Sequence, residues 1–94
     1  MITLAGHNAL ITGSTKGVGQ AIACAMAESG ANVVIHGRQM SDAAQQTLDK
    51  CRQAGVQADF ITGDLSTETA ASVEDVFGQA LAANPNIAIL VNNA

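Results

Sequence analysis

Short apolar runs alternate with longer amphipathic stretches along the whole chain. Each apolar run is bounded by turn-forming residues, as buried strands are, and each amphipathic stretch repeats its apolar residues at helical spacing. The predicted strands cover residues 8–12, 32–36, 56–62 and 87–91. The predicted helices cover residues 17–29, residues 42–54 with Ser41 as N-cap, and a third segment that begins after a cap at Ser66 or Thr67 and ends at the Asn-Pro-Asn run of residues 84–86.

Strands and helices that alternate in this way predict an α/β fold with a parallel, doubly wound sheet. Right-handed crossovers and the Rossmann-like strand order 3-2-1-4 would place the first two helices on one face of the sheet and the third on the other. The strand order then reverses between the first and fourth strands. Ligands bind at such a switch point, beside the carboxyl ends of the strands.

The predicted third helix carries one apolar stripe. Val73, Val76, Phe77 and Ala80 recur at positions i, i+3, i+4 and i+7, which is the spacing of one helix face. The spacing is typical of an amphipathic helix with one apolar face.

A glycine-rich turn, Thr-Gly-Ser-Thr-Lys-Gly-Val-Gly at residues 12–19, joins the first strand to the first helix. Gly13 would let the chain turn off the strand, Gly17 would let a ligand approach the backbone, and Gly19 would let the helix pack on the strand. The first N–H groups of the helix lack intrahelical acceptors, and the helix dipole favours an anion there. The turn therefore predicts a phosphate site, the alternative being glycines that serve packing alone.

Two of the chain's four lysine and arginine residues flank this predicted site. Lys16 lies within the turn, and Arg38 follows the end of the second strand, where an NAD-binding unit typically has a carboxylate for the ribose 2′-hydroxyl. The planar guanidinium of Arg38 suits a 2′-phosphate instead. The alternative interpretation is two solvated surface cations.

The Thr-Gly-x-x-x-Gly-x-Gly turn resembles that of the classical short-chain dehydrogenase/reductase family. Asp64-Leu65 resembles the family's Asp-Leu pair after the third strand, and Asn92-Asn93-Ala94 resembles the start of its Asn-Asn-Ala-Gly motif. These motifs follow one another in family order over nearly the whole chain. The resemblance implies that residues 1–94 are the N-terminal part of a single NAD(P)-binding Rossmann domain, similar to NADP-preferring 3-oxoacyl reductase-like members.

The resemblance also implies roles for these residues. Asp64 would accept a hydrogen bond from the adenine amino group and the Leu65 N–H would reach the ring, although a strand-end aspartate also commonly bonds its own turn. Lys16 and Arg38 would hold a 2′-phosphate, so NADP(H) is the expected cofactor in preference to NAD(H). The predicted cofactor-binding residues are Gly13, Ser14, Thr15, Lys16, Gly17, Val18, Gly19, Arg38, Asp64, Leu65, Asn92, Asn93 and Ala94.

Enzymes of this family transfer a hydride between nicotinamide and a carbonyl or alcohol, while a Tyr-x-x-x-Lys motif supplies the proton. The chain contains no tyrosine, so we predict no catalytic residue within it. A sheet that stops at its fourth strand would also leave an apolar edge. We therefore expect the cofactor-binding part of a longer, dimeric or tetrameric oxidoreductase acting on a 3-oxoacyl thioester or a sugar or polyol. A non-catalytic NADP(H)-binding sensor or regulatory protein, or a remnant that binds nothing, are the alternatives.

Composition narrows the expected partners. With 48% hydrophobic and 13% charged residues the chain has the composition of a folded domain, and a net charge of −4 argues against nucleic acid. The sequence contains no run of 18 apolar residues, so it predicts no membrane span. The first residues lack the features of a signal peptide, and we therefore expect the protein in the cytoplasm. Cys24 and Cys51 form no Cys-x-x-Cys pair, and His7 and His36 are isolated, so we expect structural roles and no metal.

Overall fold

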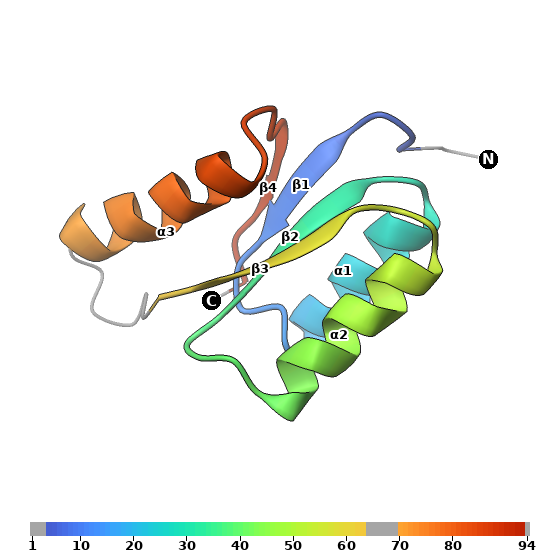
Figure 1. The fold of residues 1–94 in the computed structure, drawn as a ribbon, viewed down its shortest axis with the longest axis horizontal. Helices are drawn as coiled ribbons and strands as arrows, with labels where there is room; N and C mark the ends of the chain where they lie inside the picture. Colours follow the sequence, from blue (N-terminus) through green and yellow to red (C-terminus); the bar gives the residue numbers. More distant parts are fainter. Residues whose placement is uncertain (1–3, 64–69, 94) are drawn as a thin grey trace.

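A four-stranded parallel sheet forms the centre of the structure, a computed structural model that describes residues 4–63 and 70–93 (Figure 1). The strand order is β3-β2-β1-β4, as predicted. Asp64, Leu65 and Ala94, together with the predicted caps Ser66 and Thr67, lie outside the described residues. The strands are β1 (Asn8–Ile11), β2 (Asn32–Gly37), β3 (Ala58–Thr62) and β4 (Ile89–Val91), and the helices are α1 (Gly17–Glu28), α2 (Asp42–Gln53) and α3 (Ala70–Ala83).

Helices cover both faces of the sheet, because the central strands are apolar on both sides (Figure 1). Successive residues of a strand face opposite sides, so Leu10 and Ile11 enter two different cores. The larger core lies under α1 and α2, and the smaller one under α3. Buried residues of the larger core are Ala9, Ile11, Ala23, Ala27, Val33, Ile35, Leu48, Cys51 and Ala58, and those of the smaller core are Leu10, Val34, Ile61, Val76 and Ala80.

The helix predicted to start after Ser41 does so. The Ser41 hydroxyl accepts a hydrogen bond of 3.1 Å from the Ala44 N–H, which satisfies one of the donors that the first turn leaves unpaired. Asp42 lies in the first turn and Lys50 and Arg52 in the last, so the charges complement the helix dipole at both ends.

Only half of the apolar stripe on α3 is buried in the structure. Val76 and Ala80 are fully buried, whereas Val73 and Phe77 are 38% and 37% exposed. The reason is the placement of α3, which packs on β3 and on residues of β1 and β2 in the smaller core, whereas the described part of this core includes no residue of β4. Leu90 of β4 is accordingly 53% exposed.

Strand boundaries also differ from the predictions at the edges of the sheet. β4 begins at Ile89 and β3 at Ala58, each two residues later than predicted, because pairing with the neighbouring strand starts only there. Within the described part of the chain, no helix has the length and apolar character needed to cross a membrane.

Candidate functional site

The glycine-rich turn connects β1 to α1 at the switch point, where β1 lies between β2 and β4 (Figure 1). Gly13 and Gly17 both have φ of 61°, a left-handed conformation that glycine adopts without steric cost. Nothing lies within 4 Å of the position that a Cβ of Gly17 would take. Gly13 therefore makes the predicted sharp turn. The space that a side chain at position 17 would occupy is open.

Gly19 allows α1 to approach the end of β1, as predicted. A Cβ at this position would overlap the Gly13 carbonyl oxygen and would lie 2.6 Å from the Asn93 Nδ2 atom. The close approach lets Asn93 Nδ2 donate a hydrogen bond of 3.2 Å to the same Gly13 oxygen. Gly19 thus fixes the distance between the helix N-terminus and the strand ends.

A network around the Thr12 hydroxyl joins the carboxyl ends of β1 and β4. Thr12 Oγ1 accepts a hydrogen bond of 3.0 Å from the Asn93 N–H, and its own hydrogen is within reach of Asn92 Oδ1 at 3.3 Å and of the Val91 carbonyl at 3.4 Å. The Thr12 N–H donates to the Val91 carbonyl at 3.0 Å. The two asparagines therefore tie the ends of β1 and β4 together.

The inner side of the turn is bound to the end of β2. The Gly13 N–H donates to Nδ1 of His36 at 3.0 Å, and the Ser14 N–H donates to the His36 carbonyl at 2.9 Å. Ser14 is fully buried, and its hydroxyl accepts from the His36 N–H at 2.8 Å. The Ser14 side chain therefore anchors the turn to β2 and is not exposed for contact with a ligand.

Two polar side chains that the sequence did not identify fix the middle of the turn. The Thr15 carbonyl accepts from Gln20 Nε2 at 3.4 Å. Gln20 Nε2 also donates to Thr47 Oγ1 at 2.8 Å, and the Thr47 hydroxyl donates its own hydrogen to the Ala43 carbonyl at 2.9 Å, so α2 supports the glutamine that holds the turn. Thr47 is fully buried on α2, and its place in the sequence, 27 residues from Gln20, gives no signal of this contact.

The outer side of the turn carries the groups that an anion would meet. Gly17, Val18 and Gly19 are the first residues of α1, so their N–H groups have no acceptor within the helix. Lys16 is the N-cap residue of α1 and has an extended backbone conformation. The residues Lys16, Val18 and Arg38 are all exposed. Unpaired N–H groups, the positive end of the helix dipole and two cations together favour binding of a phosphate.

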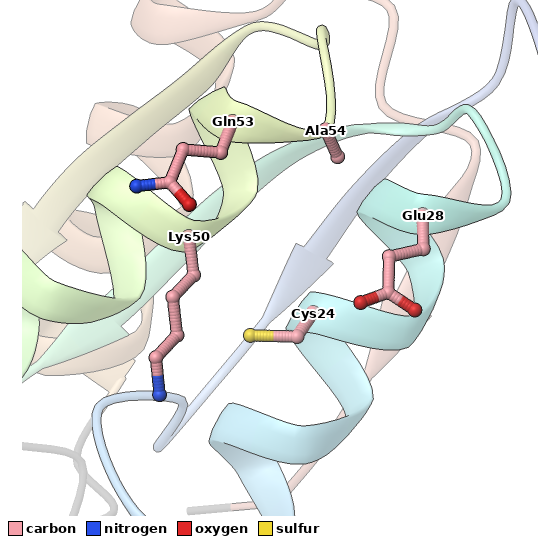
Figure 2. Close-up of a pocket in the computed structure, with 5 residues that line it drawn as sticks. All are labelled: Cys24, Glu28, Lys50, Gln53 and Ala54. Atoms are coloured by element: carbon pink, nitrogen blue, oxygen red, sulfur yellow. The ribbon is translucent and has the colours of Figure 1, made fainter.

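A surface pocket between α1 and α2 lies away from this site (Figure 2). Cys24 and Glu28 reach it from α1 and Lys50 and Gln53 from α2, all from the C-terminal halves of their helices (Figure 2). The buried Cys51 thiol, which neighbours Cys24, has its pKa raised to about 12, by burial first and then by the Cys24 thiol. Within residues 4–63 and 70–93, no group of three His, Cys, Asp or Glu side chains could hold a metal ion.

Known proteins resemble this chain in sequence and in fold. The family model described as short chain dehydrogenase matches residues 7–94. The uncharacterized oxidoreductase YhxC of Bacillus subtilis (strain 168) is 42% identical over 91 residues, which are 97% of this chain and 31% of that protein. The crystal structure of a 3-oxoacyl (acyl-carrier-protein) reductase from Agrobacterium tumefaciens C58 with NADP bound has a TM-score of 0.86 and 36% identity, over 99% of this chain and 34% of that one.

A second solved structure, the NADH-dependent reductase A1-R′ complexed with NAD, has a TM-score of 0.86 and 32% identity, over 97% of this chain and 37% of that one. One relative thus holds NADP and the other NAD on closely similar folds. The chain spans about a third of the length of the relatives it matches. With a family match over residues 7–94 and the predicted fold in place, the chain belongs to the short-chain dehydrogenase/reductase family.

Proposed function

We propose that this chain is the NADP(H)-binding part of an oxidoreductase that transfers a hydride between nicotinamide and a carbonyl or alcohol substrate. The glycine-rich turn fits the phosphates of such a cofactor, because open space beside Gly17 adjoins the free N–H groups at the start of α1. When bound, the cofactor supplies the hydride. The residues of this chain bind and orient it, and the family's tyrosine acid is not among them.

The preference for NADP(H) rests on one close approach. A Cβ at Gly37 would lie 2.8 Å from Thr15 Cγ2, so the end of β2 runs directly against the glycine-rich turn. Lys16 and Arg38 are the next residues on these two segments, and both are exposed. Two cations beside a helix N-terminus suit the additional charge of a 2′-phosphate, and residues 36–40 contain no carboxylate for a ribose 2′-hydroxyl.

The remaining assignments rest on the family resemblance. Asp64 and Leu65 would bind the adenine, and Asn92, Asn93 and Ala94 would line the adenosine side of the site. The NADP-bound 3-oxoacyl reductase among the relatives supports a 3-oxoacyl thioester as the substrate class, with a sugar or polyol as the second choice. We propose a dimer or tetramer for the complete enzyme.

Replacement of Arg38 by Asp in the full-length protein tests the cofactor assignment. A charged hydrogen bond contributes about 1.5–3 kcal/mol, so Arg38→Asp should raise the Kd for NADPH about 10- to 100-fold and change the Kd for NADH by about twofold at most. Lys50→Gln is the matched control, because it removes a cation in the pocket between α1 and α2 and should leave both Kd values unchanged. Fluorescence titration with each cofactor measures these constants. Equal losses for NADPH and NADH would contradict a 2′-phosphate role for Arg38.

A further inference from the structure

His36 connects two parts of the candidate site that are far apart in the sequence. Its ring is almost fully buried, with 3% of the residue exposed, at the end of β2. Nδ1 accepts from the Gly13 N–H at 3.0 Å, and Nε2 lies 2.8 Å from the Gly63 carbonyl oxygen. One imidazole thus spans the glycine-rich turn and the residue that directly precedes Asp64.

These two contacts define the protonation of the ring. Because the Gly13 N–H is a donor, Nδ1 must offer a lone pair, and because the Gly63 carbonyl is an acceptor, Nε2 must carry the hydrogen. The geometry therefore requires a neutral imidazole with its proton on Nε2. A ring with the proton on Nδ1 would leave both backbone groups without a correct partner.

The backbone of His36 holds the turn as well. Its carbonyl accepts from the Ser14 N–H at 2.9 Å, and its N–H donates to the Ser14 hydroxyl at 2.8 Å. The N–H groups of Gly13 and Ser14 are therefore both bound to His36, on the inner side of the turn. The N–H groups of the first residues of α1, on the outer side, stay available to a ligand.

We propose that His36 is a positioning residue for the cofactor. Its Nδ1 atom fixes the orientation of the Gly13 peptide, and its Nε2–H ties the turn to the chain segment that carries Asp64. It acts through the turn and contacts no reacting atom. The inference rests on the proposed function, because its consequence is tighter binding of the cofactor phosphates.

Three replacements separate the two ring contacts. His36→Asn retains an acceptor near the position of Nδ1, His36→Gln retains a donor near the position of Nε2, and His36→Leu removes both groups at similar volume. His7→Asn is the matched control, since His7 is exposed and lies at the opposite end of β1. For each full-length variant, fluorescence titration gives the Kd for NADPH and urea unfolding gives the stability.

We expect the Kd for NADPH to rise about tenfold in His36→Leu and in His36→Gln, because the Gly13 N–H loses its acceptor in both. His36→Asn should stay within about threefold of the wild type, and His7→Asn should equal it. A residue that only stabilises the fold would give Kd values independent of the replacement among variants that remain folded. A wild-type Kd for folded His36→Leu would therefore overturn the inference.

The tautomer gives a second measurement that needs no variant. Nuclear magnetic resonance of the full-length protein with isotope-labelled histidine and glycine should show a protonated Nε2, an unprotonated Nδ1 and coupling across the Gly13 N–H···Nδ1 hydrogen bond. If His36→Leu fails to fold, tighter NADPH binding by His36→Asn than by His36→Gln supports the inference, and equal binding overturns it. A protonated Nδ1 overturns it in any case. A wild-type protein that binds neither NADPH nor NADH would overturn the proposed function as well, so the two failures are distinguishable.

Discussion

A methyl group added at Gly19 should destabilise the protein, although alanine is the better helix former. Gly19→Ala would push a Cβ into the Gly13 carbonyl oxygen and within 2.6 Å of Asn93 Nδ2. Overpacking costs about 1–3 kcal/mol. Loss of the Asn93–Gly13 hydrogen bond adds about 0.5–1.5 kcal/mol, and the higher helix propensity of alanine offsets about 1 kcal/mol. The net loss in the free energy of unfolding is about 0.5–3.5 kcal/mol.

Gly78 provides the matched control within the same chain. It also lies inside a helix, α3, but a Cβ there would have nothing within 4 Å. Gly78→Ala should therefore stabilise the protein by about 0.5–1 kcal/mol through helix propensity alone. The same substitution is thus expected to lower the free energy of unfolding at position 19 and to raise it at position 78.

Equilibrium unfolding in urea measures both differences. Gly19→Ala should also weaken NADPH binding, because the added methyl group would push the N-terminus of α1 away from the Gly13 carbonyl and from Asn93 at the strand ends. Gly78→Ala should leave the Kd for NADPH unchanged. A Gly19→Ala protein at least as stable as the wild type would refute the argument, since the helix-propensity gain would then exceed every steric cost.

Two further predictions concern groups beside the sheet. Thr12→Val should lower the free energy of unfolding by about 1–3 kcal/mol in urea titrations, because the Asn93 N–H loses its acceptor, whereas Thr12→Ser should stay near the wild type. Cys51 should resist iodoacetamide in the folded protein, measured by mass spectrometry, because its thiol has a pKa raised to about 12. Since the unfolded thiol loses its proton first, stability should fall as the pH rises from about 9 toward 12. Rapid modification of Cys51 in the folded protein, or stability constant over that pH range, would contradict this assignment.

The sequence predicts the architecture because its local patterns all indicate the same strands and helices. Apolar runs, helical spacing and turn residues all indicate the same alternation, and the strand order follows from the handedness of the crossovers. The roles of Gly13 and Gly19 could be predicted because only glycine tolerates a positive φ or so close a backbone contact. The contact of Asn93 with the end of β1 likewise follows from the pairing of neighbouring strands.

The α3 stripe shows where periodicity alone is insufficient. Val73 and Phe77 share the helical spacing of the buried Val76 and Ala80, yet they remain more than a third exposed. Spacing gives the width of an apolar face but not the position of the helix over the sheet. That position depends on β3 and on the residues of β1 and β2 that α3 contacts, which are distant in the sequence.

The contacts of His36, Gln20 and Thr47 at the glycine-rich turn could not be predicted either, because most of them join residues that are far apart in the sequence. Both ring nitrogens of His36 meet backbone groups, and its immediate sequence neighbours do not indicate these contacts. Gln20 and Thr47 belong to different helices and meet only when these helices pack together. A polar residue directly at the end of a strand beside a glycine-rich turn was the one available signal.

The link between β1 and β4 has a consequence for the order in which the molecule is built. Thr12 and Val91 are 79 residues apart, whereas Asn8 and Asn32, which join β1 to β2, are 24 apart. Closing the longer loop costs about 1 kcal/mol more in chain entropy, and β4 is synthesised after the other three strands. We therefore expect β1, β2 and β3 to assemble with α1 and α2 before β4 docks. The candidate site at the switch point would be completed when β4 docks, so nucleotide binding by a nascent chain would report the docking of this strand.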